Sequence, residues 1–303
     1  MANVYAEYAF DQRASDLSNL LRFFASEYFL DNENYVFEGV TYQDLYEVVW
    51  YDGAYFSTIF AGSSFSNSDD SVTGTVTAVL ESVYSGGEWV ILYGITGISV
   101  SSAALLSAAQ TDSTTDDYVI INGALSGSDN FYLSDASDYA DGRGGNDRMY
   151  GYDGNDKLNG GNNNDKLYGG TGNDTLRGDA GKDSLQGDAG KDTLTGGSGA
   201  DSFIFRSVSE SATVATADVI TDFAVGTDKI DLSAIDASTI LGGNNAFSFN
   251  GTTKFGTSTQ GEIYYKKFSD HTMVYIDNDG DNGVEMAIRL TGLHNLTASD
   301  FVL

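Results

Sequence analysis

Aspartate recurs at every ninth residue over a long internal stretch of this chain of 303 residues. Each carboxylate offers a hard anionic oxygen, and the glycines between them allow backbone carbonyls to turn toward the same point. Calcium takes about six to eight such oxygens, from carboxylates and carbonyls together. The spacing therefore predicts a row of cation sites. The periodic aspartates are Asp129, Asp138, Asp147, Asp156, Asp165, Asp174, Asp183, Asp192 and Asp201.

Seven consecutive nine-residue units occupy residues 142–204. Each unit begins with Gly, usually has Gly again at position four, and places Asp at position six and an apolar residue at position eight. A nonapeptide period of this kind is typical of a calcium-binding parallel β-helix. The alternative, a flexible Gly/Asn-rich linker, does not explain the constant phase. The apolar residues at position eight are Met149, Leu158, Leu167, Leu176, Leu185, Leu194 and Phe203.

Two units are expected to form one coil, so that units eighteen residues apart stack on the same side. The apolar residue after each Asp would then lie on a short strand and point into a thin core. Asp129 and Asp138 keep the phase but lack the glycines, and Phe131 and Ala140 stand at their position eight. We therefore interpret residues 124–141 as degenerate coils that cap the roll.

The units resemble the RTX nonapeptide repeat, GGxGxDxUx, of secreted bacterial proteins, in which U is a large apolar residue. That resemblance implies a parallel β-roll. It also implies that calcium is held by carbonyls of positions one and three of one unit, carbonyls of positions two and four of the unit two further on, and both Asp side chains. The implied metal-binding residues are Gly142, Gly144, Asp147, Gly151, Asp153, Asp156, Gly160, Gly161, Asn162, Asn163, Asp165, Gly169, Gly170, Thr171, Gly172, Asp174, Gly178, Asp179, Ala180, Gly181, Asp183, Gly187, Asp188, Gly190, Asp192 and Asp201.

Several units depart from the RTX pattern. Position two holds Arg143, Tyr152, Asp179 or Asp188 in four of them, and position four holds Asn163 in one. A carbonyl ligand survives such a change, but each side chain must fit where glycine is usual. Asn163 is the most demanding substitution, because position four often needs the conformational freedom of glycine.

The segments 200–238 and 275–303 resemble the C-terminal β-roll extension of the serralysin family, down to the terminal Asp-Phe-Val-Leu of residues 300–303. The likeness covers roughly residues 124–303. It implies a module that caps the roll and carries a type I secretion signal. Apolar-alternating runs predict strands in this module, the last three of them in an antiparallel sheet. The runs are 202–205, 218–223, 229–232, 262–268, 272–279 and 284–290.

Residues 277–281 look like the start of an EF-hand loop. The match fails, because such a loop requires Gly at its sixth position and Glu at its twelfth, where this chain has Asn282 and Ile288. A hairpin turn is the favoured interpretation. Asp222 and Asp228 also lie next to turns and are only weak candidates as ligands.

Charge and composition exclude several classes of partner. The chain has 44 acidic and 15 basic residues, a net charge of −29. It should repel nucleic acid and anionic lipid. There is no cysteine, so bound metal would have to provide the cross-links that disulfides provide in many secreted domains.

Localisation is inferred from the repeats. Residues 1–30 show no secretory signal peptide, and no stretch of 18 apolar residues suggests a transmembrane segment. Cytosolic calcium is too low to fill weak sites of this kind. We therefore expect a secreted, extracellular protein, either free or associated with the cell surface, that is exported by a type I secretion apparatus.

Known catalytic motifs are missing from the sequence. The only histidines are His271 and His294, and neither belongs to the HExxH zinc motif that a serralysin protease needs. There is no GxSxG elbow, no P-loop and no cysteine nucleophile. We predict that the chain is not an enzyme.

Residues 1–123 are predicted to form a small α+β domain around an antiparallel sheet. Helices are expected at 16–29, from an apolar stripe, and at 101–110. Strands are expected at 35–37, 46–51, 55–60, 74–83 and 89–100. The segment holds 11 of the 19 tyrosines and both tryptophans. These aromatics could fill the core or form a protein or sugar interface. Carboxylate pairs such as Glu33/Glu38 and Glu47/Asp52 are poor evidence for acid/base catalysis.

The sequence thus predicts a mainly β protein in three parts: the domain 1–123, the roll 124–204 and the C-terminal module 205–303. The favoured function is a non-enzymatic calcium-binding protein that folds after export. Its N-terminal domain would bind a partner or self-associate in a surface layer, adhesion or matrix role. The alternatives are a small extracellular polysaccharide-binding or polysaccharide-cleaving protein and a membrane-active RTX protein.

Overall fold

The computed structural model is mainly β and divides into two compact units. One comprises Met1–Ser134 with Arg143–Gly145, and the other comprises Asp135–Gly142 with Asn146–Leu303. The structure describes residues 3–6, 26–30, 35–37, 40–42, 44–51, 55–68, 71–85, 88–101, 125–133, 135–238, 244–256 and 261–303.

The first unit contains an antiparallel sheet with strand order β2-β5-β6-β7-β8-β1, followed by β9, which pairs with β1 in parallel. The short strands β3 and β4 pair separately. All the strands predicted in this segment are confirmed. The bounds are β1 (Asn3–Ala6), β2 (Ser26–Leu30), β3 (Tyr35–Phe37), β4 (Val40–Tyr42), β5 (Asp44–Tyr51), β6 (Tyr55–Ser68), β7 (Ser71–Ser85), β8 (Glu88–Ser101) and β9 (Asn130–Tyr132).

The helix predicted over 16–29 is wrong at its C-terminal end, where residues 26–30 form β2. This strand pairs antiparallel with β5, and the backbone hydrogen bonds of that pairing override a helical apolar spacing. Residues 16–25 lie outside the described residues. So do residues 102–110 of the other predicted helix, while Ser101 ends β8.

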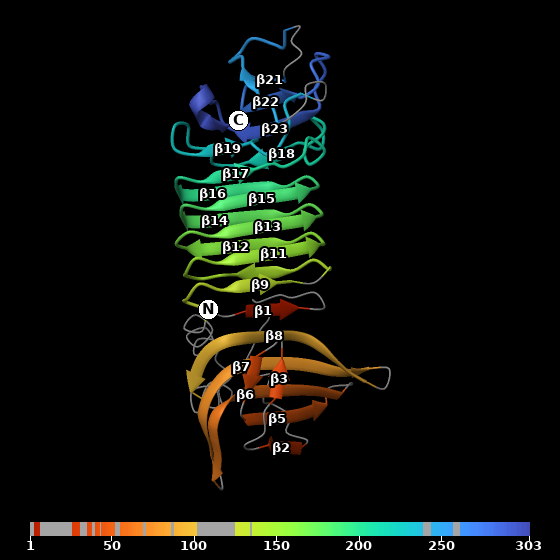
Figure 1. Ribbon diagram of the computed structural model, residues 1–303, viewed down its shortest axis with the longest axis vertical. Coiled ribbons are helices and arrows are strands. Elements are labelled where there is room, and N and C mark those ends of the chain that lie inside the picture. Colours follow the sequence, from red (N-terminus) through yellow and green to blue (C-terminus); the bar gives the residue numbers. More distant parts are fainter. Residues whose placement is uncertain are drawn as a thin grey trace. The chain divides into compact units, whose positions relative to one another are not determined.

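The nonapeptide units form the stacked strands of a parallel roll, seen in Figure 1 as successive rungs from β11 to β16. Partners lie eighteen residues apart, as in Leu158 opposite Leu176 and Leu167 opposite Leu185. The prediction of two units per coil is therefore confirmed. The bounds are β10 (Tyr139–Asp141), β11 (Arg148–Asp153), β12 (Lys157–Asn162), β13 (Lys166–Thr171), β14 (Thr175–Gly181), β15 (Ser184–Ala189) and β16 (Thr193–Gly199).

The core of the roll is a column of the apolar residues at position eight. Every one of the seven is at most 2% exposed, and Ala140 of the degenerate coil is fully buried as well. β10 pairs with β12 in the same register, with Ala140 opposite Leu158. Burying each large side chain contributes about 1.5–3 kcal/mol, so the core is thin but regular.

The C-terminal module continues both sheets of the roll. β18 pairs in parallel with β16 and also with β23, and from β23 the sheet continues antiparallel through β22 to β21 (Figure 1). On the other side, β17 pairs with β19 and β19 with β24. The predicted antiparallel strands are confirmed, and their parallel junction with the roll is a new finding. The bounds are β17 (Ser202–Ile204), β18 (Asp218–Ile220), β19 (Lys229–Asp231), β20 (Ser248–Phe249), β21 (Glu262–Lys267), β22 (His271–Asp277), β23 (Met286–Thr291) and β24 (Phe301–Val302).

Candidate metal centre

The repeat aspartates form two hydrogen-bonded rows along the roll. In each row, one carboxylate oxygen, Oδ1, accepts a hydrogen bond from the backbone N–H of the aspartate eighteen residues earlier. Examples are Asp165, which accepts from Asp147 at 2.7 Å, and Asp174, which accepts from Asp156 at 2.8 Å. The same contact recurs along both rows at 2.8–2.9 Å. One oxygen of each carboxylate therefore ties successive coils together.

The second oxygen, Oδ2, has no hydrogen-bond donor in most of these side chains. Within the described residues it is buried and accepts no hydrogen bond. A buried anionic oxygen without a partner is costly, so this row needs positive charge to compensate it. The side chains in question are Asp156, Asp165, Asp174, Asp183, Asp192 and Asp201.

The glycine at position one makes room for this oxygen. A Cβ added at Gly178 would lie only 2.4 Å from Oδ2 of Asp183, and one added at Gly187 would lie 2.3 Å from Oδ2 of Asp192. Any larger residue would therefore push the carboxylate out of place. The glycine and the aspartate of one unit act as a pair, which explains why their spacing is constant.

Position four needs glycine for a different reason. Gly172 has φ of +145°, and a Cβ there would lie 1.5 Å from the carbonyl oxygen of Gly154 in the preceding coil. The carbonyls of position four thus point toward the next coil on the same side. Thr171, a predicted ligand, has its carbonyl engaged by the N–H of Gly154 at 2.9 Å.

The unusual residues of the repeat keep the glycine-like backbone. Arg143, Tyr152, Asp179 and Asp188 all have φ between +65° and +70°, and Asn163 has φ of +78°. Asn and Asp tolerate this left-handed region better than other non-glycine residues. Tyr152 is 46% exposed, so its ring is accommodated on the surface. The backbone shape of the loops therefore survives these departures.

Burial raises the pKa of the row carboxyls. The pKa of Asp165 is raised to about 8 and those of Asp156 and Asp192 to about 7, first by desolvation and then by neighbouring carboxylates of the same row. Backbone hydrogen bonds lower these pKa values but do not offset burial. The charged form is thus unfavourable until a cation is bound.

The chemistry of the donors fits calcium. The row offers carboxylate and carbonyl oxygens only, and such hard ligands suit calcium or magnesium rather than zinc or copper. Positions one to three lie at strand ends, as Gly151 and Asp153 do in β11. Position four follows the strand or is its last residue, as Gly181 is in β14, and positions five and six lie outside the strands. The choice of carbonyl ligands stays a prediction.

Asp218 and Asp228 extend the rows beyond the last repeat. The N–H of Asp192 donates to Asp218 at 2.8 Å, and the N–H of Asp201 donates to Asp228 at 3.0 Å. We did not predict Asp218 as a site residue and gave Asp228 little weight. The signal was nevertheless present, because each begins an Asp-x-Ile run like positions six to eight of the repeat.

The carboxylates of Asp277, Asp279 and Glu285 also approach one another, within 4.8 Å. Asp277 ends β22, and Asp279 and Glu285 lie in the turn between β22 and β23. These strands are antiparallel neighbours, so the hairpin prediction is confirmed. Asp277 accepts hydrogen bonds from the N–H groups of Asp279 and Gly280 at 3.0 and 2.6 Å. The cluster thus shapes the hairpin.

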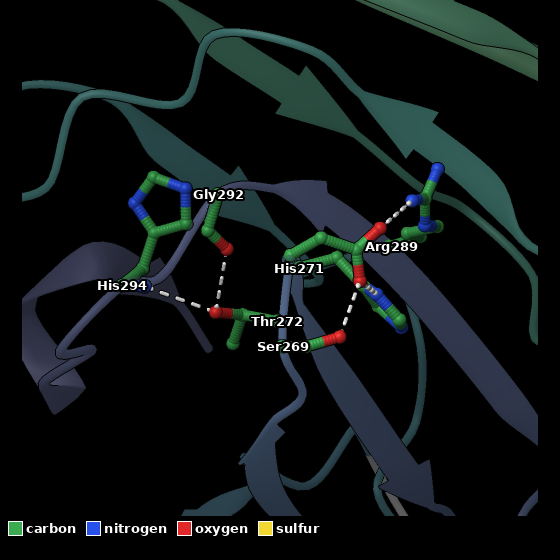
Figure 2. Close-up of polar contacts among 7 residues, drawn as sticks. Ser269, His271, Thr272, Arg289, Gly292 and His294 are labelled. Atoms are coloured by element: carbon green, nitrogen blue, oxygen red, sulfur yellow. Dashed lines mark hydrogen bonds and ion pairs between the residues drawn. The ribbon is translucent and has the colours of Figure 1, made fainter.

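Both histidines make polar contacts within the C-terminal module (Figure 2). Nδ1 of His271 lies 2.7 Å from Oδ1 of Asp270, whose other oxygen lies 3.5 Å from Arg289. The backbone N–H of His294 donates to Oγ1 of Thr272 at 2.9 Å. These contacts account for both histidines as structural residues.

Together, the parallel coils and the buried aspartate rows define an RTX-like β-roll protein. A family model, Peptidase M10 serralysin C terminal, matches residues 97–303. The chain belongs to this family. The matched region corresponds to the repeat domain of serralysin, which is a non-catalytic part of that protease, and repeats of this family bind calcium.

The chain is also similar to part of a protease and to two solved structures. Serralysin A of Dickeya chrysanthemi is 40% identical over 104 residues, which is 34% of this chain but only 20% of that protein. The chain thus spans about a fifth of the length of that relative. Two solution structures, the AlgE6R3 and AlgE6R2 subunits of the Azotobacter vinelandii mannuronan C5-epimerase, are each 25% identical. They cover 58% and 59% of this chain, and this chain covers 78% and 89% of theirs, with TM-scores of 0.27 and 0.28.

Among the described residues, no helix is long and apolar enough to cross a membrane.

Proposed function

We propose that this chain is a secreted, non-enzymatic calcium-binding protein whose roll folds when it meets calcium after type I export. The observation that carries the proposal is the row of buried Oδ2 atoms that accept no hydrogen bond from the described residues. Calcium would neutralise these oxygens and join them to carbonyls of the stacked coils. The serralysin family membership supports the export route, since the matched C-terminal module includes residues 205–303.

Folding and binding are coupled in this proposal. Without a cation, buried carboxyl groups lie one coil apart along each row, and their pKa values are raised, as that of Asp165 is. The whole chain also carries a net charge of −29. Such a chain resists compaction through self-repulsion. Binding free energy then becomes folding free energy, as in other small metal-dependent domains. Low calcium inside the cell would keep the chain extended for export, and high calcium outside would order it.

The role proposed for the N-terminal domain is interaction or self-assembly. Its paired strands form an antiparallel sheet from β2 to β1, and its sequence combines many aromatic residues with an excess of acidic ones. Aromatic residues are enriched at protein interfaces. The proposed partner is a second copy of the chain or a surface glycan or protein, in a surface layer, adhesion or matrix role.

The deciding experiment is a calcium titration of metal-free full-length protein, followed by far-ultraviolet circular dichroism and by light scattering for size. We expect β structure to appear cooperatively as calcium is added and to vanish again with chelator. Magnesium at equal concentration serves as the control for simple charge screening. A chain that shows its full β signal in chelator would contradict calcium-coupled folding.

A further inference from the structure

The outer face of strands β11 and β13 carries cations beside tyrosines. The two strands are parallel neighbours, with Arg148 opposite Lys166 and Tyr150 opposite Tyr168. The buried apolar residue at position eight stands between the cation and the tyrosine of each strand and points into the core. Because side chains alternate along a strand, the cations and the tyrosines point outward. Both cations are exposed, and both tyrosines are partly exposed.

The tyrosines form one packed group on this face. The rings of Tyr150 and Tyr168 stack, with centroids 4.9 Å apart and planes 5° apart. Tyr152 extends the group, because its ring centroid lies 6.4 Å from that of Tyr150 and the residue is 46% exposed. The group ends at β15, where Gln186 is buried and donates a hydrogen bond to Asp188 at 2.6 Å. We call this surface the cation–tyrosine face, and its residues are Arg148, Tyr150, Tyr152, Lys166 and Tyr168.

The two cations of this face have no acidic partner within the described residues. Neither the Arg148 nor the Lys166 side chain forms an ion pair or a hydrogen bond there. By contrast, Arg177 on the other sheet of the roll pairs with Asp179. Like charges directly opposite one another on neighbouring strands are destabilising. An anionic partner bound at this face would offset that repulsion.

The negative charge of the roll lies largely inside it. The aspartates at position six are all buried, whereas seven of the 15 Lys and Arg residues of the chain fall within residues 142–204. Six of these seven are exposed. The outside of the roll therefore presents positive charge, although the chain as a whole is acidic. The six exposed residues are Arg148, Lys157, Lys166, Arg177, Lys182 and Lys191.

The chain itself contains a strongly acidic partner for such a surface. Residues 1–123 hold 17 acidic and only 2 basic residues. Complementary charge speeds the encounter of two surfaces and selects the partner. Tyr and Arg are enriched at protein interfaces, and Tyr loses little conformational entropy on binding. A second copy of the chain always supplies the acidic segment at the same concentration as the roll.

We propose that the cation–tyrosine face docks the acidic N-terminal domain, residues 1–123, of a second copy of this chain. The inference rests on the self-association proposed for that domain and assigns the surface that receives it. Contacts between different parts of two identical molecules are heterologous, and they build open chains unless the rotation between copies closes a ring. Head-to-tail chains of this kind suit a surface layer or matrix.

The test measures the mass of calcium-loaded full-length protein by analytical ultracentrifugation over a range of protein concentrations. We expect the mass to rise with concentration and to fall toward that of a single chain in high salt, since charges are screened beyond about 3 Å at about 1 M. Lys166→Glu should weaken association at least about tenfold.

Lys157→Glu is the matched control. It reverses an exposed charge that has no ion-pair partner among the described residues, but on β12 of the other sheet, so association should be unchanged. Each of the two lysines directly follows a row aspartate, so any effect of the new charge on calcium binding is the same in both variants. Both should show the calcium-induced β signal of the unmodified chain. If Lys166→Glu does not fold, Lys166→Gln takes its place, because it removes the charge without reversing it.

Three results would count against the docking. Equal association by folded Lys166→Glu and Lys157→Glu would overturn this surface and leave self-association to another one. An unmodified chain that stays single at every concentration would overturn docking of a second copy. Binding of polygalacturonate that Lys166→Glu abolishes, by a chain that does not self-associate, would assign the face to an anionic glycan instead. Calcium-coupled folding is judged separately by circular dichroism in chelator, so its failure is distinguishable from failure of the docking.

Discussion

The carboxylate of Asp183 accepts a 2.8 Å hydrogen bond from the backbone N–H of Asp165, two units earlier in the chain. Its other oxygen is buried and accepts no hydrogen bond from the described residues. One side chain therefore joins two stacked coils through one oxygen and leaves its other oxygen buried without a hydrogen bond. The fold and the proposed metal site share the same carboxylate, so a change in one should affect the other.

Substitutions within one unit can separate the role of the side chain at position six from that of the side chain at position three. Asp156→Asn removes a buried charge from the row, and we expect the calcium concentration for half-maximal folding to rise at least about tenfold. Asp153→Asn is the matched control, because Asp153 is exposed and is predicted to bind through its carbonyl. Calcium titrations followed by circular dichroism compare the two, and equal midpoints would contradict the ligand assignment.

Metal-free protein should be more stable in mild acid than at alkaline pH. Burial raises the pKa of Asp165 from 3.8 to about 8 and that of Asp156 to about 7. The folded chain therefore binds protons more tightly than the unfolded chain, and stability falls as pH rises from about 4 to about 8. Circular dichroism of metal-free protein at pH 5 and pH 8 tests this. Equal β signals would speak against buried, protonated row carboxyls.

The steric demand at position four can be tested against another glycine with positive φ. Gly172→Ala would place a methyl group 1.5 Å from the carbonyl oxygen of Gly154, which should cost about 3 kcal/mol or more through strain and overpacking. Gly226 has a φ of +81°, but a Cβ added there would have no atom within 4 Å. Gly226→Ala should therefore cost only about 1–2 kcal/mol. Urea unfolding in saturating calcium measures both. A similar loss in both variants would show that backbone strain alone matters.

Truncating the core column should destabilise the roll without touching any ligand. Leu185 is fully buried, and Leu185→Ala should cost about 2–5 kcal/mol. Leu293→Ala is the control, because Leu293 is 57% exposed. Thermal unfolding at high calcium is the measurement. A Leu185 variant as stable as the control would mean that metal binding rather than apolar packing holds the coils together.

Much of the roll could be predicted because its contacts are strictly periodic. A residue such as Leu167 meets its partner Leu185 at a constant interval of eighteen, so local sequence carries the long-range pairing. Asp218 escaped prediction because an irregular segment breaks that interval. The helix predicted over 16–29 failed over 26–29 because β2 pairs with a distant strand, β5, and such pairing leaves no local signal.

The sequence by itself determined the repeat, the two-unit coil, the apolar column and the oxygen donors that the loops carry, because each depends on residue type and spacing alone. Tertiary structure decided which carboxylate oxygens accept backbone hydrogen bonds and which accept none. Asp218 and Asp228 are both aspartates in Asp-x-Ile runs, yet only Asp228 meets a second backbone donor, the N–H of Ala224. That difference arises from how the chain turns after the last repeat, since hydrogen-bond partners depend on position in space.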